Sequence, residues 1–242
     1  MADINVQQEV QFGFLPTLGR DRLYGWIDFM LVQTGFGIAA WCFLVGGYTG
    51  TYVQAEYAIL AILVGNAFPV LMILPYAVST SRYGVDTFIG SNAALGFNLS
   101  RTLLVFFAVL NQGWIVTACF MLGQACSNIA DIFGASEFFT KRTTGAPLFA
   151  LIFYAIGMWI AWKGPRMIRR FVRVGVPAIL IILVGLIGFV VFKYGLDEVM
   201  SSQPQLPFPT FREGIATSIE VNAGLGFSWL VYLGQWCRLA KR

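Results

Sequence analysis

Long apolar runs separated by short polar segments make up most of this chain. Because a bilayer core of about 30 Å needs roughly 20 helical residues to cross it, six of these runs predict membrane-spanning helices. We expect them at residues 27–49, 57–78, 102–126, 147–162, 174–192 and 215–236. The fourth run is short, and the sixth is the least apolar, since it contains Glu220 and Asn222. The pattern therefore predicts an all-α membrane protein.

The same pattern divides the chain into three parts: a polar tail over residues 1–23, the six helices over 24–236, and a short end over 237–242. Composition agrees, because 57% of the residues are hydrophobic and only 12% are charged, whereas a soluble domain has about 25% charged residues. The lipid bilayer is therefore an expected partner. The net charge of +4 lies in the gaps between apolar runs, so it does not indicate nucleic-acid binding.

Few residues with catalytic chemistry occur in the apolar runs. The chain has no histidine, and its four cysteines lack metal-binding or redox spacing. No pair of carboxylates stands at helical spacing within the spans. We therefore do not expect an enzyme.

Basic residues indicate how the helices are oriented. Residues 163–173 hold five of the sixteen Lys and Arg residues, and positive charge near a span favours the cytoplasmic side. With the N-terminus inside, twelve basic residues lie in cytoplasmic segments and four in outer loops. We therefore predict a multi-pass plasma-membrane protein with both termini in the cytoplasm. Asp28 then lies at the cytoplasmic edge of the first span, where we expect it to be solvated or paired with Arg20 or Arg22.

Glycines fall inside the first and sixth predicted spans, as Gly35-Phe36-Gly37 and Gly224-Leu225-Gly226. Such glycines either interrupt a helix so that freed carbonyls face a cavity, or they let two helices pack closely. The two pairs lie five spans apart, which is the spacing of equivalent helices in a five-helix inverted repeat. The sequence leaves both interpretations open.

Four short stretches stand out along the chain: Trp26-Ile27-Asp28, residues 83–96, Asn111-Gln112-Gly113-Trp114 and residues 226–238. In this order they are similar to motifs of the nucleobase–cation symporter family, which includes cytosine, purine, allantoin and hydantoin permeases. The match has departures: Asn111 stands where cytosine permeases have Gln, Asp86 replaces Pro, and Gln235 stands where the family has Asp.

The resemblance implies a leucine-transporter-like fold built from two inverted five-helix repeats. This chain covers the first repeat plus the sixth helix, so we expect it to be truncated, the N-terminal half of such a permease. The implied function is import of a nucleobase or related planar heterocycle of the cytosine or purine type, coupled to a cation, by alternating access. The alternative is a membrane module that does not transport. The missing half or a second copy is an expected partner, and because the repeats form the substrate site between them, we expect no uptake by the isolated chain.

Trp114 lies near the middle of the third predicted span, too deep for an interfacial tryptophan. It either packs in the core or offers a flat face to a planar ligand, where stacking on a base contributes about 1–3 kcal/mol. Asn111 lies one helical turn earlier on the same face, and its carboxamide suits the amide-like edge of a base; an interhelical hydrogen bond is the alternative. Thr117 shares this face.

The resemblance implies further site residues. Trp229 is expected to close the other face of the substrate, with Ser228 beside it. Backbone carbonyls at Gly37 and Ala40 are expected to bind a sodium ion, and because that stretch holds no carboxylate, Na+ is favoured over H+ as the coupling ion. No other metal or cofactor is expected. Glu220 lies one turn from the outer end of its span, where it either functions or simply reaches water.

Overall fold

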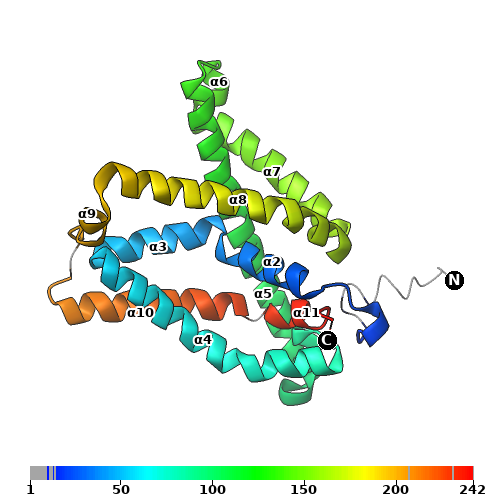
Figure 1. Cartoon of the computed structure of the whole chain (residues 1–242). Helices are drawn as coiled ribbons and strands as arrows, with labels where there is room; N and C mark the ends of the chain where they lie inside the picture. Colours follow the sequence, from blue (N-terminus) through cyan, green and yellow to red (C-terminus); the bar gives the residue numbers. More distant parts are fainter. Residues whose placement is uncertain (1–9, 11–12, 14, 207, 231, 242) are drawn as a thin grey trace. The chain divides into compact units, whose positions relative to one another are not determined.

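The structure is a computed structural model that describes every residue except 1–9, 11–12, 14, 207, 231 and 242 (Figure 1). The described residues form a series of helices joined by short turns, as the apolar pattern predicts. They divide into two compact units, one made of residues 1–87 and 171–242 and the other of residues 88–170. Each unit is described separately.

The first unit holds both ends of the chain. Its elements are the 3-10 helix η1 (Gly19–Asp21), α2 (Trp26–Gly37), α3 (Ala40–Tyr52), α4 (Ala55–Tyr83), most of α8 (Pro165–Tyr194), α9 (Leu196–Met200), α10 (Phe211–Leu230) and α11 (Leu233–Cys237). The second unit contains α5 (Thr87–Ile132) after its first residue, α6 (Glu137–Thr140), α7 (Gly145–Trp162) and the beginning of α8.

Four helices, α4, α5, α7 and α8, are long and apolar enough to cross a membrane, and the bent pair α2 and α3 makes a fifth if it counts as one span. They coincide with the first five predicted spans. In the part of the chain that the structure describes, α10 does not meet the same measure, because Arg212, Glu213 and Glu220 lie among its 20 residues. The six-span organisation stays a prediction.

Large apolar side chains point outward along the long helices of both units, for example Leu63 on α4 and Leu151 on α7. In water such faces would have to be covered, whereas lipid tails solvate them in a bilayer. Trp26 and Trp162, at the ends of α2 and α7, are also exposed. Exposed tryptophans at helix ends are typical of the membrane–water interface.

Helix α10 packs most extensively against α4 in the first unit. A methyl group added at Gly65 would lie 2.7 Å from the carbonyl oxygen of Ile219, and one at Gly226 would lie 2.9 Å from Cγ of Pro69. Neither site has room for a larger side chain. The contact at Gly226 therefore agrees with the packing interpretation, in which glycine lets two helices approach closely.

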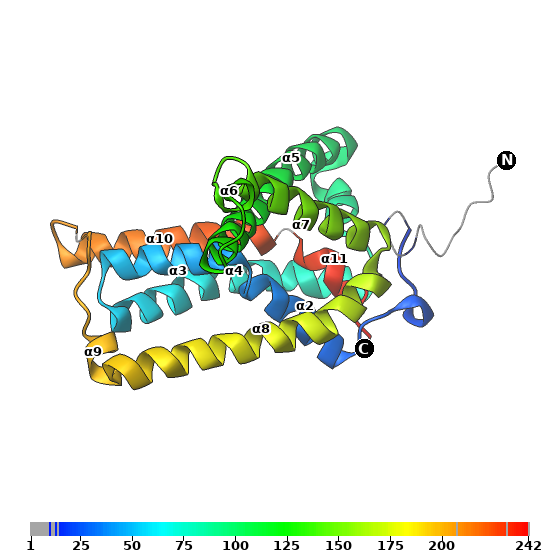
Figure 2. The ribbon, with the colours of Figure 1, turned by 90° about the horizontal axis from the view of Figure 1, so that it is seen from above.

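Helix α10 also lies beside α3 (Figure 2). The side-chain amide of Asn222 donates a hydrogen bond of 2.9 Å to Oγ1 of Thr49, and both side chains are buried. Asn222 thus acts as an interhelical hydrogen-bonding residue, while Glu220, two residues earlier, is exposed. Such bonds between membrane helices contribute about 0.6 kcal/mol on average.

The segments before α2 and after α11 meet at one end of the first unit. The backbone N–H of Lys241 donates to the carbonyl oxygen of Tyr24 at 2.8 Å. The buried Arg22 guanidinium donates to the carbonyl oxygens of Ser81, at the end of α4, and Ala240. Three chain segments are therefore tied together by one cation.

Arg238 makes a second buried junction at this end. Its guanidinium donates to Oγ1 of Thr17 at 2.8 Å and to the carbonyl oxygen of Val10 at 2.6 Å. Burial lowers the pKa of this guanidinium from its usual value, against the opposing effects of Asp86 and Tyr24. Arginine nevertheless stays protonated in proteins, so the junction is cationic.

Asp28 is not solvated, so that part of the expectation is wrong. It is only 4% exposed, and both of its carboxylate oxygens accept hydrogen bonds from Arg173, at 2.5 and 3.0 Å. The partner comes from α8, 145 residues away in the chain. The two-point geometry suits a guanidinium and a carboxylate, and the bond holds the beginning of α2 against α8.

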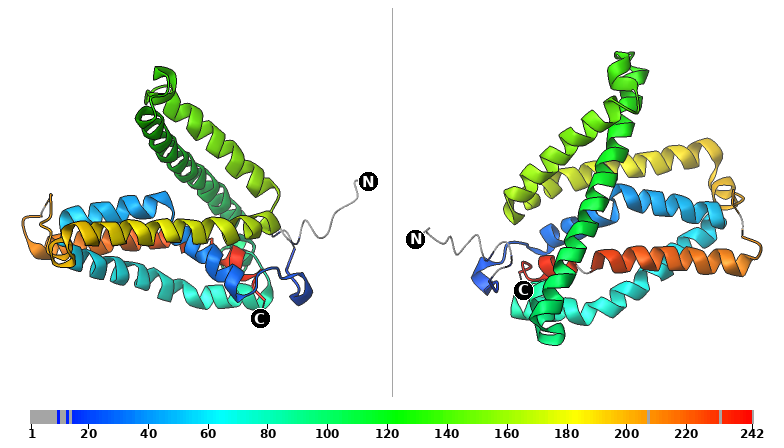
Figure 3. Two further views of the ribbon diagram at one scale, coloured as in Figure 1. Left: turned by 45° about the horizontal axis from the view of Figure 1, so that its top comes forward. Right: turned by 180° about the vertical axis from the view of Figure 1, so that it is seen from behind.

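The second unit is built around a hairpin of α5 and α7 (Figure 3). Gly96 interrupts α5 with a positive φ of 73° and a ψ of 166°, a conformation that glycine adopts readily. Gly123 lies against Ala146 of α7 so closely that an added methyl group would be 2.2 Å from its carbonyl oxygen. The hairpin thus depends on glycine at the contact.

Candidate functional site

The first helix is interrupted between α2 and α3. Helix α2 ends at Gly37 and α3 begins at Ala40, and the axes on either side differ by 51°. A methyl group added at Gly37 would meet no atom within 4 Å, so packing does not require glycine there. The helix ends at the second glycine of the pair, whereas Gly35 lies within α2, where an added methyl group would be 3.4 Å from Cγ2 of Val176.

The sixth predicted span is also divided, although not at its glycines. Gly224 and Gly226 lie within the helical part of α10, which continues to Leu230, and α11 begins at Leu233. The end of α10 therefore comes directly after Trp229. Of the two interpretations that the sequence leaves open, Gly226 agrees with packing, because an added methyl group would lie 2.9 Å from Cγ of Pro69 on α4.

Four aromatic residues connect the two interruptions, and we call Phe36, Trp41, Trp229 and Trp236 the aromatic cluster. The rings of Trp41 and Trp229 stack with centroids 4.8 Å apart and planes 16° apart. Phe36 contacts Trp229 with centroids 5.6 Å apart and Trp236 with centroids 5.8 Å apart. The cluster therefore places the end of α2 and the beginning of α3 against the end of α10 and α11.

Three buried hydrogen-bond donors near this cluster have no acceptor among the described residues: Nε1 of Trp229, Nε1 of Trp236 and Nε2 of Gln33. Gln33 lies one turn before Phe36 on α2. A buried donor without an acceptor costs about 1–3 kcal/mol, so these groups are available for a ligand or water. Gln33 is not among the site residues predicted from the sequence. Its polar carboxamide within the first apolar run could have indicated it.

The predicted ion ligands Gly37 and Ala40 flank the interruption. Backbone hydrogen bonds around it use the carbonyl oxygens of Thr34, Phe36 and Ala39, and the Cys42 thiol lies 3.4 Å from the Phe36 oxygen. In the described part of the chain, no three His, Cys, Asp or Glu side chains form a group that would hold a metal ion. Backbone oxygens at the interruption are of the type that suits a hard cation.

Asn111, Trp114 and Thr117 lie on α5 in the second unit, one turn apart, so they share a helical face as predicted. Trp114 is 37% exposed and Asn111 is half-buried. Thr117 donates its hydroxyl proton to the Gly113 carbonyl at 2.9 Å, leaving oxygen lone pairs as acceptors. Gln112 does not share this face. Its side-chain oxygen accepts a hydrogen bond of 3.1 Å from the hydroxyl group of Tyr154 on α7.

Trp229 and Ser228 belong to the first unit, with Gly37 and Ala40. Ser228 donates to the Leu225 carbonyl at 2.7 Å within α10, so its proton is already used. One face of Trp229 is covered by Trp41. The predicted site residues thus form two groups, one in each unit.

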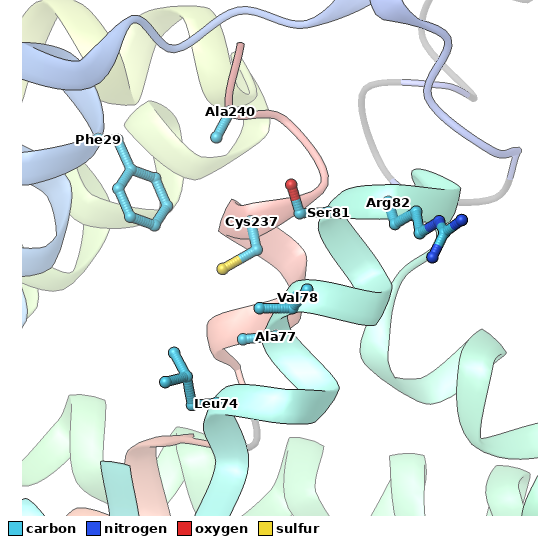
Figure 4. A pocket seen from close by; sticks show the side chains of 8 residues that line it. All are labelled: Phe29, Leu74, Ala77, Val78, Ser81, Arg82, Cys237 and Ala240. Carbon is cyan, nitrogen blue, oxygen red and sulfur yellow. The ribbon is translucent and has the colours of Figure 1, made fainter. Parts of the chain in front are cut away.

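An open cleft of about 640 Å³ lies elsewhere in the first unit. It is lined by Phe29 of α2, residues of α4 from Leu74 to Arg82, Cys237 and Ala240, and the Cys237 thiol points toward the space between Phe29 and Leu74 (Figure 4). Its walls are mainly apolar and include none of the predicted site residues. We therefore assign the candidate site to the interrupted helices.

No family model matches the chain, and no curated protein or solved structure is significantly similar to it.

Proposed function

We propose that this protein is part of a secondary active transporter that imports a nucleobase or related planar heterocycle together with a cation. The observation that carries the proposal is the contact between two interrupted helices, made by the stacked Trp41 and Trp229. Interrupted helices that meet in pairs are the usual binding elements of inverted-repeat transporters. The family resemblance rests on the four sequence stretches alone.

The chemistry around the interruption suits a planar ligand with carbonyl acceptors. Indole rings supply flat faces, on which a base stacks with about 1–3 kcal/mol. The unpartnered donors of Gln33, Trp229 and Trp236 suit the carbonyl oxygens or ring nitrogens of a heterocycle. The resemblance also implies substrate roles for Trp114 and Asn111, which lie on α5 in the second unit.

Sodium is the coupling ion that the first helix favours. No Asp or Glu occurs between Asp28 and Glu56, so a proton carrier would have to come from another helix. Carbonyl oxygens at Gly37 and Ala40 would instead bind a hard cation without titrating.

The proposed orientation has both termini in the cytoplasm of a cell with this protein in its plasma membrane. Supporting contacts bring Asp28 of α2 to Arg173 of α8, and Tyr24 to Lys241. The beginnings of the first and fifth predicted spans and the end of the sixth thus meet at one end of the first unit. In the proposed topology, an even number of membrane crossings separates these three points, so all three lie on the cytoplasmic side.

The test is uptake of labelled cytosine, adenine, uracil, hypoxanthine, allantoin and hydantoin by cells expressing the complete coding sequence that contains these 242 residues. We expect uptake of at least one compound that depends on a sodium gradient. Trp229→Ala should reduce it, whereas Trp162→Ala, at an exposed helix end, is the matched control and should not. Binding without uptake would favour the non-transporting module, and neither binding nor uptake of any compound would refute the proposal.

A further inference from the structure

One face of α2 carries Gln33 and Phe36. Gln33 precedes Phe36 by three residues, so the two side chains are neighbours on the helix surface. Phe36 also contacts the indoles of Trp229 and Trp236, with ring centroids 5.6 and 5.8 Å away. All four residues belong to the first unit. One carboxamide and two indoles therefore lie next to the same phenyl ring.

The nitrogen atoms of these three polar side chains are donors without acceptors. Nε2 of Gln33, Nε1 of Trp229 and Nε1 of Trp236 are buried, and none has a hydrogen-bond partner among the described residues. An indole nitrogen can only donate, whereas a carboxamide can turn over and offer its oxygen instead. The two indoles therefore require that a bound ligand present acceptors.

Backbone acceptors at the interruption of the first helix are already in use. The carbonyl oxygens of Thr34, Phe36 and Ala39 each accept a backbone hydrogen bond. In the proposed function, the carbonyl oxygens of Gly37 and Ala40 bind the coupling cation. An amino group on a ligand would therefore compete for acceptors that are taken, whereas a carbonyl oxygen would meet donors that are not.

We propose, on the basis of the proposed function, that this site selects an oxo heterocycle over its amino counterpart, with Gln33 and Trp236 as specificity-determining residues. Uracil and hypoxanthine carry a carbonyl oxygen where cytosine and adenine carry an amino group. Stacking does not separate the members of a pair, because every base has a π-face. Hydrogen bonding separates them, because a mismatched analogue leaves the buried polar groups of the site unpaired.

The experiment measures dissociation constants by calorimetry on the purified protein from the complete coding sequence that contains these 242 residues. Uracil is compared with cytosine, and hypoxanthine with adenine, in the presence of sodium. In each pair that binds, we expect the oxo compound to bind about ten-fold more tightly or better, because an unpaired buried donor weakens binding by about that factor.

Two variants test the residues. Trp236→Phe keeps an aromatic ring but removes the N–H, and Gln33→Glu replaces a possible donor with an acceptor. Each should weaken binding of the oxo compound by about ten-fold and move the ratio of the two affinities toward one. Trp162→Phe, the same aromatic exchange at an exposed helix end, is the matched control and should keep the ratio.

The affinity ratio distinguishes selection from a structural role, because a structural role would weaken both compounds of a pair alike. If Trp236→Phe does not fold, Gln33→Glu carries the test. Equal or tighter binding of the amino compounds by the wild-type protein, or an unchanged ratio in both variants, would overturn this inference and leave the proposed function intact. Failure to bind any of the four compounds, allantoin or hydantoin would refute the proposed function and this inference together.

Discussion

Trp41 and Trp229 stack face to face, with ring centroids 4.8 Å apart and planes inclined by 16°. Trp41 belongs to α3 and Trp229 to α10, so this one contact joins the first helix to the sixth. It also covers one face of the indole that the resemblance assigns to substrate stacking. A ligand that stacks on Trp229 must therefore use the opposite face or displace Trp41.

The stacked pair should show energetic coupling. Because aromatic pairs contribute about 0.5–1.5 kcal/mol beyond their buried area, Trp41→Ala and Trp229→Ala should be non-additive by that amount in the free energy of unfolding. Mixed-micelle denaturation of the two single variants and the double variant measures it. Additive losses would mean that the stack makes no specific contribution.

Trp114→Ala should weaken binding of the transported heterocycle. Loss of a stacking face costs about 1–3 kcal/mol, or roughly ten- to hundred-fold in affinity, and Trp114→Phe should keep part of it. Calorimetry and melting temperature are measured on the same variants of the complete coding sequence. A well-folded Trp114→Ala protein with unchanged affinity would remove this residue from the site.

Removing either partner of the Asp28–Arg173 pair should destabilise the first unit unequally. The Asp28 side chain is 6% exposed and the Arg173 side chain 55% exposed. Arg173→Gln removes two charge-assisted hydrogen bonds to a buried carboxylate and should cost about 1–3 kcal/mol, whereas Asp28→Asn leaves an arginine that water solvates and should cost less. Mixed-micelle denaturation compares them, and equal losses would contradict this asymmetry.

The charge distribution predicts which end of α8 faces the cytoplasm. In a variant without native cysteines, Met167→Cys should react with a membrane-impermeant maleimide only from the cytoplasmic side, and Thr143→Cys only from outside. Labelling in intact cells and in inverted vesicles measures this. The reverse pattern would refute the predicted topology.

Cys237 should react slowly with maleimides at neutral pH. It lies just beyond the sixth predicted span, and burial raises the pKa of its thiol from 9.0 to about 11. The reactive thiolate is thus about 100-fold scarcer than for an ordinary thiol at any pH below 9. The test compares two variants. In one, Cys237 is the single cysteine kept, and its labelling rate should rise up to about pH 11. In the other, all native cysteines are removed and Ser201→Cys is added, and its labelling rate should level off near pH 9.

The same shift has a consequence for stability. Because the folded-state pKa of Cys237 is raised, its contribution to the free energy of unfolding is complete below about pH 9 and is lost as the pH rises toward 11. Cys237→Ala should remove this part of the alkaline destabilisation. A reactivity plateau near pH 9 for Cys237 itself would contradict both expectations.

The apolar runs were enough to locate five helices, since crossing a bilayer is a requirement on length and composition that each segment meets alone. Likewise, the shared face of Asn111, Trp114 and Thr117 follows from the local geometry of a helix. The glycine pair in the first helix made an interruption one of two open interpretations, because glycine weakens a helix locally. These features depend on residues close together in the chain.

The tertiary structure alone decided which distant residues meet. Asp28 pairs with Arg173, 145 residues away in the chain, because the packing of α2 against α8 brings this guanidinium to both carboxylate oxygens. Gly226 serves close packing rather than interruption, because Pro69 of α4 occupies the adjacent space. Long-range contacts result from the packing of whole helices, which no local pattern specifies.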